Sequence, residues 1–334
     1  MRMTGMHKRI FRAAILALLI IGLSLSDALA KSLRIGSVGL SGELLPLWVA
    51  QDKGLFKKNG LDTEVITFYQ AGPAPIQSLL AGEIQFAVTG TSTGTNAKMG
   101  GAEIVAIAEF VNTLPYTLVA SQKIKSADQL KGKRFAVSRL GTISDISLRK
   151  ALRNLGINPE KEAVILGIGD QTLRFGAMKG GSVDATLISP PLTVTARKLG
   201  FNLITSFQRA GIKWAYDSIY IAVAFGHKNR ETVLNFLKGF VEAMAYIHKN
   251  KEESLRVLGK WMHLTDREAL DETYDYLMEI LPRKPYSLDE GMQALLDAIA
   301  VTNPKAKGFT PQDFNDMSYI QELDRSGFID RVYQ

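Results

Sequence analysis

Apolar and polar positions alternate along the chain in an order that predicts strands followed by amphipathic helices. The apolar run at 33–38 precedes a polar turn and a helical pattern that ends near Gly54. A strand at 62–68, a helix that ends at Gly82 and a strand at 84–89 follow. Because strands that alternate with helices form parallel sheets covered by helices, this pattern predicts an α/β fold.

The same order of elements returns later in the chain. A strand at 134–138 precedes a helix that ends at Gly156, and a strand at 183–188 follows a helix that ends near Gly181. A single doubly wound sheet would give a similar pattern. The shared order of glycines and polar loops instead favours two doubly wound lobes of similar construction.

We place residues 31–114 and 226–334 in the first lobe and residues 115–225 in the second. The segments 110–121 and 214–225 are the expected crossings of a hinge. The residues after 225 are mostly helical in pattern, with apolar positions at spacings of three and four. We expect them to pack on the first lobe and complete it. A separate helical domain that binds a partner is the alternative.

Residues 1–30 have the pattern of a cleavable signal peptide. Basic residues precede an apolar run at 13–23, and the motif ALA at 28–30 predicts cleavage after Ala30. The run is shorter than the roughly 18 to 20 apolar residues that cross a bilayer, which makes an uncleaved membrane anchor the weaker alternative. Export by this route predicts a periplasmic protein.

The composition of the chain excludes several kinds of binding, metal and catalytic site. Removal of residues 1–30 takes away four Lys/Arg and one Asp and lowers the formal net charge from +7 to +4, and no dense basic block suggests nucleic-acid binding. The absence of cysteine excludes disulfides, thiolate metal sites, cysteine nucleophiles and a cysteine-linked lipid. The four histidines lack the spacing of a zinc motif. The sequence therefore predicts no catalytic residue, no metal site and no cofactor.

Four polar loops are the candidate ligand site. Ligands of parallel sheets bind outside the carboxyl ends of the strands. Those ends here carry the polar segments 37–43, 89–95, 138–145 and 189–191. Two facing lobes would bring all four loops around one cleft, where Tyr216 could add an aromatic wall.

The loop before the helix of the second lobe leaves its chemistry open. The free N–H groups of a helix N-terminus attract anions, but Ser144 or Asp145 is expected to cap this helix. A capping Asp145 would repel an anion, whereas an Asp145 that faces the cleft could bind an amine or a hydroxyl group. The Ser/Thr-rich segment 89–98 leaves a similar choice between a polar ligand site and a capped turn.

Longer stretches carry a family resemblance. The segments AQDKGLFKKNGLDTEVI, QSLLAGEIQFAVTG, SADQLKGKRFAVSRLGTISDISLRKALRNLGINPEKEAVIL and GAMKGGSVDATLISPP resemble periplasmic substrate-binding proteins of the nitrate/sulfonate/taurine ABC importer family. The resemblance covers roughly residues 33–225 and extends to proteins that bind pyrimidine precursors of thiamine. It implies a type II periplasmic binding fold, in which two crossings join two lobes around the ligand. By position it implies ligand contacts from the four polar loops, at Ser41, Gly42, Thr89, Gly90, Thr91, Ser92, Gly141, Thr142, Ser144, Asp145, Ser189 and Pro190.

The expected function is that of a monomeric, non-enzymatic receptor for a small solute. The resemblance implies capture of a sulfonate-, taurine-, nitrate- or pyrimidine-like ligand by lobe closure. Delivery to an ABC permease and its ATPase at the inner membrane would follow. A ligand-sensing module for a membrane kinase and an enzyme related to pyrimidine biosynthesis are the alternatives.

Overall fold

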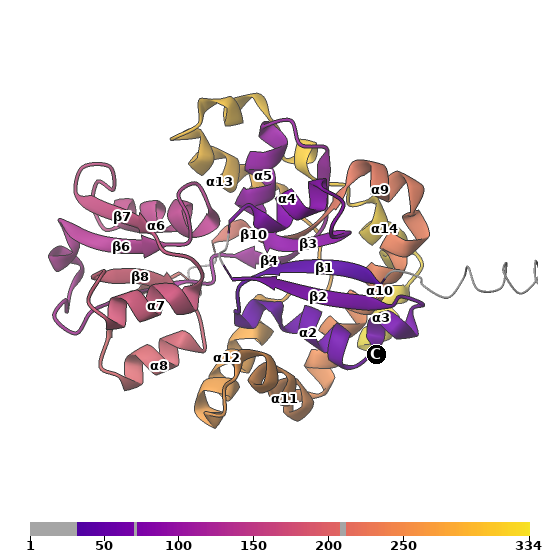
Figure 1. The fold of residues 1–334 in the computed structure, drawn as a ribbon, viewed down its shortest axis with the longest axis horizontal. Coiled ribbons are helices and arrows are strands. Elements are labelled where there is room, and N and C mark those ends of the chain that lie inside the picture. The colour runs from indigo at the N-terminus through magenta and orange to yellow at the C-terminus, as the bar shows by residue number, and fades with distance from the viewer. Residues whose placement is uncertain (1–31, 70–71, 208–211) are drawn as a thin grey trace, which may run out of the picture. The chain divides into compact units, whose positions relative to one another are not determined.

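The computed structural model describes residues 32–69, 72–207 and 212–334 (Figure 1). The predicted signal peptide and its cleavage site after Ala30 lie outside these residues. Residues 34–334 form one compact unit that contains two five-stranded sheets. Within the described ranges, no helix has both the length and the apolar character needed to cross a membrane.

The sheet of the first lobe has the strand order β2-β1-β3-β10-β4. Strand β1 runs parallel to β3, while β10 is antiparallel to both β3 and β4. The central strand β3 is buried along most of its length, as expected where helices cover both faces of a sheet. The strands are β1 (Leu33–Val38), β2 (Thr63–Phe68), β3 (Phe86–Gly90), β4 (Ile104–Thr113) and β10 (Lys213–Ala222).

The sheet of the second lobe repeats this order as β7-β6-β8-β5-β9. Strand β6 is parallel to β7 and β8, while β5 is antiparallel to β8 and β9. Strands β1 to β3 therefore correspond in place to β6 to β8, which confirms the predicted α/β fold of two similar lobes. The strands are β5 (Thr117–Ala120), β6 (Lys133–Val137), β7 (Ala163–Gly167), β8 (Ala185–Ile188) and β9 (Asn202–Ser206).

Strand β10 differs from its predicted place. The sequence analysis put residues 214–225 in a crossing and ended the second lobe at residue 225. Instead, Lys213–Ala222 hydrogen-bonds between β3 and β4, with Ile219 opposite Val88 in the first sheet. The ladder holds this segment because Ile219 and its neighbours are buried in the first lobe. The chain therefore returns to the first lobe before Lys213.

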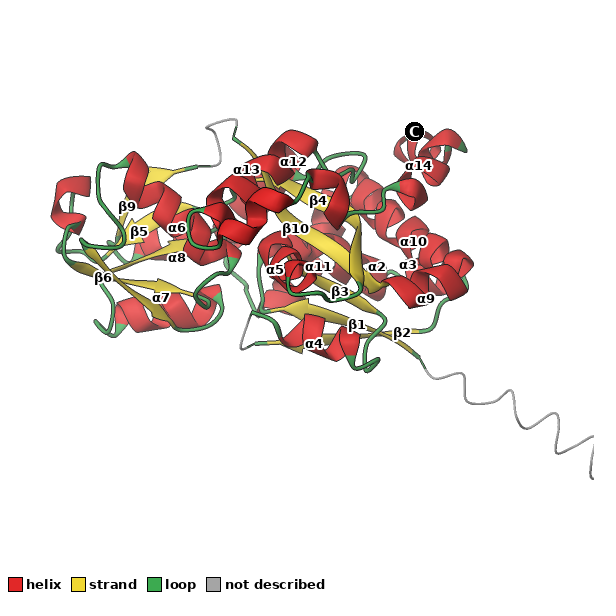
Figure 2. Cartoon of the chain, turned by 90° about the horizontal axis from the view of Figure 1, so that it is seen from above, coloured by secondary structure: helices red, strands yellow, loops and turns green. Residues whose placement is uncertain are grey.

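Helices cover both sheets (Figure 2). In the first lobe, α2 and α3 pack against the long helix α10, on which Phe236 stacks on Phe86 and Phe56 with ring-centroid distances of 3.9 and 5.0 Å. The C-terminal helices thus build the core of this lobe. Its helices are α2 (Leu45–Asp52), α3 (Leu55–Lys58), α4 (Ala74–Leu80), α5 (Thr91–Met99), α9 (Val223–Lys228), α10 (Arg230–Lys249), α11 (Lys251–Met262), α12 (Arg267–Ile280), α13 (Asp289–Ala300), α14 (Ser318–Arg325) and α15 (Phe328–Tyr333).

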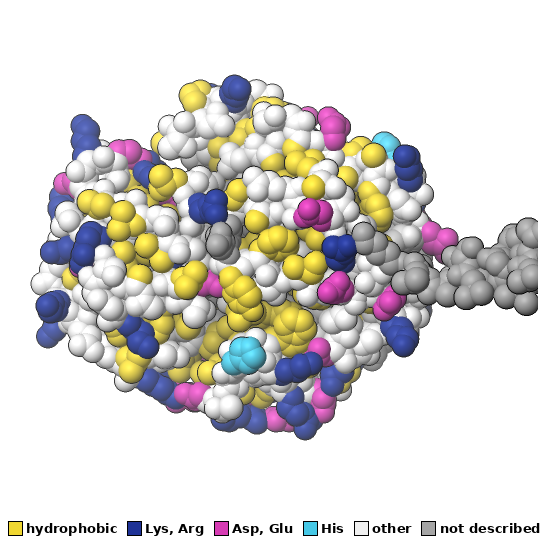
Figure 3. All heavy atoms as spheres, in the orientation of Figure 1, with side chains coloured by type: hydrophobic (Ala, Val, Ile, Leu, Met, Phe, Trp, Pro, Cys, Tyr) yellow, Lys and Arg dark blue, Asp and Glu magenta, His cyan; other side chains and the backbone are white. Residues whose placement is uncertain are grey.

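The second lobe carries fewer helices and a smaller core. Phe175 and Met178 of α7 pack with Val119 of β5 and Ala136 of β6. Its helices are α6 (Ile143–Asn154), α7 (Gln171–Lys179) and α8 (Leu192–Lys198). Short 3-10 turns complete the two lobes, at Gly42–Leu44, Ala127–Leu130, Pro304–Gly308 and Pro311–Phe314. On the face drawn in Figure 3, Lys and Arg side chains are spread around the perimeter rather than gathered in one block.

Glu109 is a buried acid in the sheet of the first lobe. It is 1% exposed, and its Oε2 accepts a hydrogen bond from the Ser287 hydroxyl at 2.9 Å. Its Oε1 has no partner among the described residues. Burial raises the pKa of Glu109 to about 8, and the nearby Asp217 carboxylate adds to this rise. The side chain is therefore protonated at neutral pH.

This shift makes the stability of the protein depend on pH. In the unfolded chain Glu109 ionises above its ordinary pKa of 4.5, so the wild type should lose stability as pH rises from about 4.5 to 8. Glu109→Gln cannot ionise, and its unfolding free energy should exceed that of the wild type by a gap that grows toward about 4–5 kcal/mol at pH 8.5. Urea unfolding at pH 5 and pH 8.5 measures the gap. An equal gap at both pH values would contradict the buried, neutral state.

Candidate functional site

The carboxyl ends of the strands in both lobes border one cavity, with a volume of about 70 Å³. Of the predicted site residues, five line it: Ser41, Thr89, Gly90, Thr142 and Tyr216. They come from the loop after β1, the end of β3, the start of α6 and strand β10. The predicted meeting of polar loops from two lobes therefore occurs at this cavity.

The other eight predicted residues do not line the cavity. Most of their polar groups are used within the fold. Thr91 and Ser92 form the buried first turn of α5 rather than a loop, and the Thr91 hydroxyl lies 2.8 Å from that of Ser218. The Ser189 N–H donates to Gln171 Oε1 at 2.7 Å. The remaining five are Gly42 in a 3-10 turn, Gly141 before α6, Ser144 and Asp145 in its first turn, and Pro190, which lines a third cavity.

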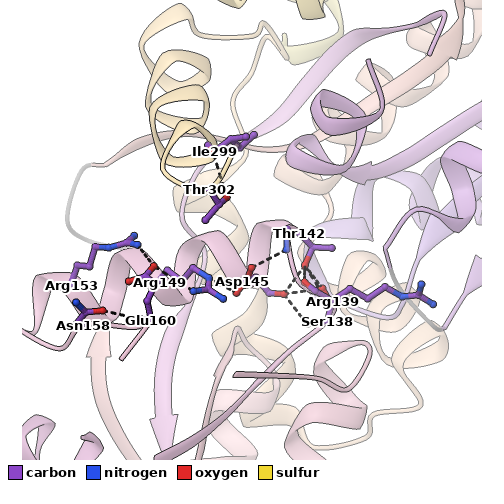
Figure 4. A network of polar contacts seen from close by, with 12 residues as sticks. Ser138, Arg139, Thr142, Asp145, Arg149, Arg153, Asn158, Glu160, Ile299 and Thr302 are labelled. Carbon is purple, nitrogen blue, oxygen red and sulfur yellow. Dashed lines mark hydrogen bonds and ion pairs between the residues drawn. The ribbon is translucent and has the colours of Figure 1, made fainter. Parts of the chain in front are cut away.

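Asp145 lies on a different cavity from the one between the strand ends. The predicted cap at Ser144 or Asp145 is wrong, because Thr142 is the N-cap of α6. Asp145 sits in the first turn, where its carboxylate accepts the Gly141 N–H at 2.8 Å and the Arg149 Nε–H at 2.9 Å (Figure 4). Its side chain is 6% exposed. Both of its oxygens are therefore engaged within the second lobe.

That second cavity, of about 630 Å³, lies between α6 and α13. Figure 4 shows Arg149 and Arg153 on one side of it and Ile299 and Thr302 on the other. Both arginines already pair with Glu160. Among the described residues, no group of three or more His, Asp and Glu side chains is placed to hold a metal ion.

Arg174 is the main cavity residue that the sequence analysis missed. It projects from α7, is 2% exposed and lines the cavity between the strand ends. Its Nη1 and Nη2 donate to the carbonyl oxygens of Gly169 and Leu187 at 3.1 and 2.9 Å. No ion pair joins it to a carboxylate in the described parts of the chain, and its Nε lacks a partner there. A buried charge without a counterion costs several kcal/mol, so this arrangement favours an anion in the cavity.

Acidic and aromatic groups also line or border this cavity. Asp217 of β10 lines the cavity, and Glu43 beside it is fully buried and accepts a hydrogen bond from the Tyr276 hydroxyl at 3.1 Å. Burial raises the pKa of both carboxyls, and Glu43 raises the pKa of Asp217 further. Tyr116 and Tyr216 meet edge to face with a ring-centroid distance of 5.3 Å. Burial also raises the pKa of both phenols.

The sequence offered a signal for one of these residues. Asp217 is the one acid in the strand pattern WAYDSIYIA, in which seven of the nine residues are apolar or aromatic, and a charged residue is rarely buried without a reason. Arg174 gave no such signal. Its helix pattern identifies an amphipathic helix but does not say that this arginine lies on the buried side.

The two lobes touch on both sides of the cavity. Asn96 Nδ2 donates to the Gly141 carbonyl oxygen at 3.0 Å. On the other side, α8 and α12 are joined by ion pairs, of which Arg197–Glu272 measures 2.7 Å and Lys198–Glu268 measures 2.9 Å. The lobes are therefore closed around the cavity.

A family model described as NMT1/THI5 like matches residues 42–254. This match covers more than half of the chain. The chain belongs to the NMT1/THI5-like family. Together with the relatives and solved structures described next, this match confirms the predicted resemblance to periplasmic substrate-binding proteins.

Curated relatives of this NMT1/THI5-like chain are named as binding proteins. A putative binding protein of Bacillus subtilis (strain 168) is 26% identical over 215 residues, which are 63% of this chain and 64% of that protein. The chain thus spans just under two thirds of that relative. A putative binding protein of Brucella abortus (strain 2308) is 29% identical over 267 residues, or 77% and 79% of the two chains. A putative ABC transporter periplasmic binding protein of Brachyspira hyodysenteriae is 27% identical over 135 residues, or 40% and 38%.

Solved structures share the fold of this NMT1/THI5-like protein. A protein from Bordetella bronchiseptica RB50 aligns with a TM-score of 0.77 at 20% identity, over 88% of this chain and 97% of that one. The alkanesulfonate-binding protein of Xanthomonas axonopodis pv. citri, bound to MOPS, aligns with a TM-score of 0.67 at 18% identity, over 87% and 96%. At these identities the likeness shows the fold alone.

The closed arrangement predicts a response to loss of the α8–α12 ion pairs. Arg197→Ala with Lys198→Ala removes four partly exposed pairs, each worth about 0.2–1 kcal/mol. We expect the ligand-free double variant to have a larger radius of gyration by small-angle scattering than the wild type. In 1 M salt, which screens exposed ion pairs, the radius of gyration of the wild type should approach that of the double variant.

The matched control is Arg267→Ala, because Arg267 pairs with Glu252 and Asp271 inside the first lobe. Its radius of gyration should equal that of the wild type. Equal radii of gyration for the control and the double variant would contradict the idea that these ion pairs hold the two lobes together.

The contacts of Asp145 predict a structural effect. Asp145→Ala removes two hydrogen bonds to a buried carboxylate and should lower the unfolding free energy by about 1–3 kcal/mol in urea at pH 7. The control, Asp297→Ala, lines the same cavity but loses only an exposed bond from Gln293. If Asp145→Ala lowers the unfolding free energy no more than this control does, the structural role of the Asp145 hydrogen bonds is wrong.

Proposed function

We propose that this protein is the solute-binding receptor of an ABC-type importer and captures a small organic anion between its lobes. The observation that carries the proposal is Arg174, a buried cation without a counterion in the described residues, on the wall of a cavity bordered by both lobes. An anionic ligand supplies the missing charge.

Lobe closure gives the cavity its affinity. Contacts between the lobes exclude water, and a charge pair is stronger where water is excluded. A guanidinium presents its N–H groups in a planar fork that suits sulfonate or carboxylate oxygens. Two of the five N–H groups of Arg174 are held by backbone carbonyls, which fix the orientation of the fork before the ligand arrives. The closed shape is then the state that a membrane permease distinguishes from the open one.

The names of the relatives support this role and its location. One relative is named as an ABC transporter periplasmic binding protein, and one solved neighbour as an alkanesulfonate-binding protein. With the predicted signal peptide, they favour a receptor that is exported to the periplasm and hands its ligand to an inner-membrane permease. The binding-protein names also favour a role without catalysis.

A thermal-shift screen with Arg174 variants tests the proposal. Sulfonates, amino-sulfonates and carboxylates at millimolar concentration are the probes, and at least one should stabilise the wild type. Arg174→Met should weaken binding of that probe tenfold or more, because it removes a charged hydrogen-bond donor. Arg134→Met is the control, since Arg134 lies in the same lobe but pairs with Asp184 at the surface. Undiminished binding by Arg174→Met, or turnover of a probe, would overturn the proposal.

A further inference from the structure

We propose that the cavity between α6 and α13 is a second ligand site, which binds a single-chain amphipathic anion, a molecule with one anionic head group and one apolar chain. This site lies outside the cavity between the strand ends and goes beyond the proposed receptor function. Its two walls belong to different lobes, so a bound anion holds the lobes together.

The α6–α13 cavity is separate from the cavity between the strand ends, and no described residue lines both. Thr93 and Thr142 line the cavity between the strand ends, whereas their neighbours Asn96 and Gly141 line the α6–α13 cavity. Asn96 Nδ2 donates to the Gly141 carbonyl oxygen at 3.0 Å, so a contact between the lobes stands where the two cavities approach each other. The volume of about 630 Å³ is typical of small-molecule sites, which measure about 300–1,000 Å³.

Apolar side chains from both lobes line this cavity. Leu140 of the second lobe is 63% exposed, and Val301 of the first lobe is 59% exposed. Ile146 of α6 and Ile299 of α13 also line it, and Figure 4 shows Ile299 across the gap from α6. Removal of apolar surface from water is favourable, so an apolar chain between these side chains is stabilised by both walls.

Lys150 supplies the charge for the anionic head group. It lines the cavity, and it forms no hydrogen bond or ion pair within the described residues. Its Nζ lies 5.6 Å from the centre of the ring of Trp214, which is fully buried. A cation over an aromatic face is attracted to the ring. This contact places the ammonium group at the wall of the cavity.

The other cations of the wall already have partners. Arg149 pairs with Asp145 at 2.9 Å and with Glu160 at 3.5 Å, and Arg153 also pairs with Glu160. Lys150 is therefore the one cation on this wall without an ion pair in the described parts of the chain. Asp297 on the opposite wall carries a negative charge, which directs an anionic head group away from α13 and toward α6.

The length of the wall sets the size of the ligand. The part of α6 that lines the cavity runs from Asp145 to Asn154, which at about 1.5 Å per residue is about 13 Å. An extended chain of about ten carbon atoms, with bonds of about 1.5 Å, is of similar length. Residues four apart share one face of a helix, so a chain with its head group at Lys150 passes Ile146 toward Leu140.

Occupancy of this site is linked to lobe closure. When the lobes separate, α6 and α13 separate, and a ligand between them loses its contacts with one wall. Such a ligand binds the closed arrangement more tightly than the open one, so its binding favours closure. The anion is therefore a second effector of closure, in addition to the solute at the strand ends.

Isothermal titration calorimetry at pH 7 with matched probes, below their micelle concentrations, tests the site. Decanoate has the proposed head group and chain. Decyltrimethylammonium has the same chain with a cationic head group, and propanoate has the same head group with a short chain. The wild type should bind decanoate at least tenfold more tightly than either of these two. Decyl phosphate then shows whether the site prefers a carboxylate or a phosphate head group.

Lys150→Met tests the charge of the wall. It keeps the length of the side chain and should weaken decanoate binding tenfold or more, because the head group loses a charged hydrogen-bond donor. Lys179→Met is the matched control. Lys179 Nζ also lies over a ring, 5.8 Å from the centre of Phe175, but Lys179 does not line the cavity.

Val301→Asp tests the wall on the first lobe. It removes exposed apolar surface, adds a negative charge, and should also weaken decanoate binding tenfold or more. The control is Val164→Asp, because Val164 is 51% exposed on β7 and does not line the cavity. Both controls should bind decanoate as the wild type does.

The outcomes decide each part of the proposal. If the wild type binds neither decanoate nor decyl phosphate at millimolar concentration, or if Lys150→Met binds decanoate as tightly as Lys179→Met, the site is wrong. Equal binding of decanoate and decyltrimethylammonium would overturn the charge of the ligand. Unchanged binding by Val301→Asp would overturn the bridge between the lobes. The receptor function is tested separately, with Arg174→Met and small anions.

Discussion

Strand β10 is the element on which both the fold and the site depend, because it completes the sheet of the first lobe with a segment that arrives from the second. It is hydrogen-bonded on both edges, to β3 and to β4, so it cannot leave the sheet without breaking two ladders. Strand β5 has the equivalent place in the second lobe, between β8 and β9. Each passage between lobes therefore begins and ends in a strand of one of the two sheets, which keeps the lobes connected.

Burial of charge is the second constraint. It explains why the cavity between the strand ends has polar groups on its wall that are not all paired within the protein. Several buried polar groups near it are satisfied within their own lobe, as the bonds of Ser189 to Gln171 and of Asp170 to the Leu173 N–H illustrate. Arg174 Nε and Glu43 Oε2 have no hydrogen-bond partner among the described residues. Burying an unpaired polar or charged group costs free energy, and only a ligand of the right charge and length removes that cost. The unpaired groups of the cavity therefore determine which ligands bind.

The sequence was sufficient for the architecture and insufficient for the site. Strands 33–38 and 134–138 were predictable because each is an apolar run followed by a polar turn and a helix, and the repeat of glycines identified two lobes. The place of β10 was missed because an apolar segment gives no information about which sheet it joins. Asp145 was overrated because a polar residue at a helix start can serve its own helix equally well. Arg174 was missed because periodicity identifies a helix but not the charge that the tertiary fold buries.

The order of the strands along the chain also determines which lobe can be completed first during synthesis. The second sheet is built from Thr117–Ser206 alone, so all of its strands are present once that continuous stretch has been made. The first sheet needs β10, and its core needs Phe236 of α10 as well. The edge of β3 that pairs with β10 therefore stays unpaired until the later part of the chain has been synthesised. The first lobe to be begun is therefore the last one to be finished.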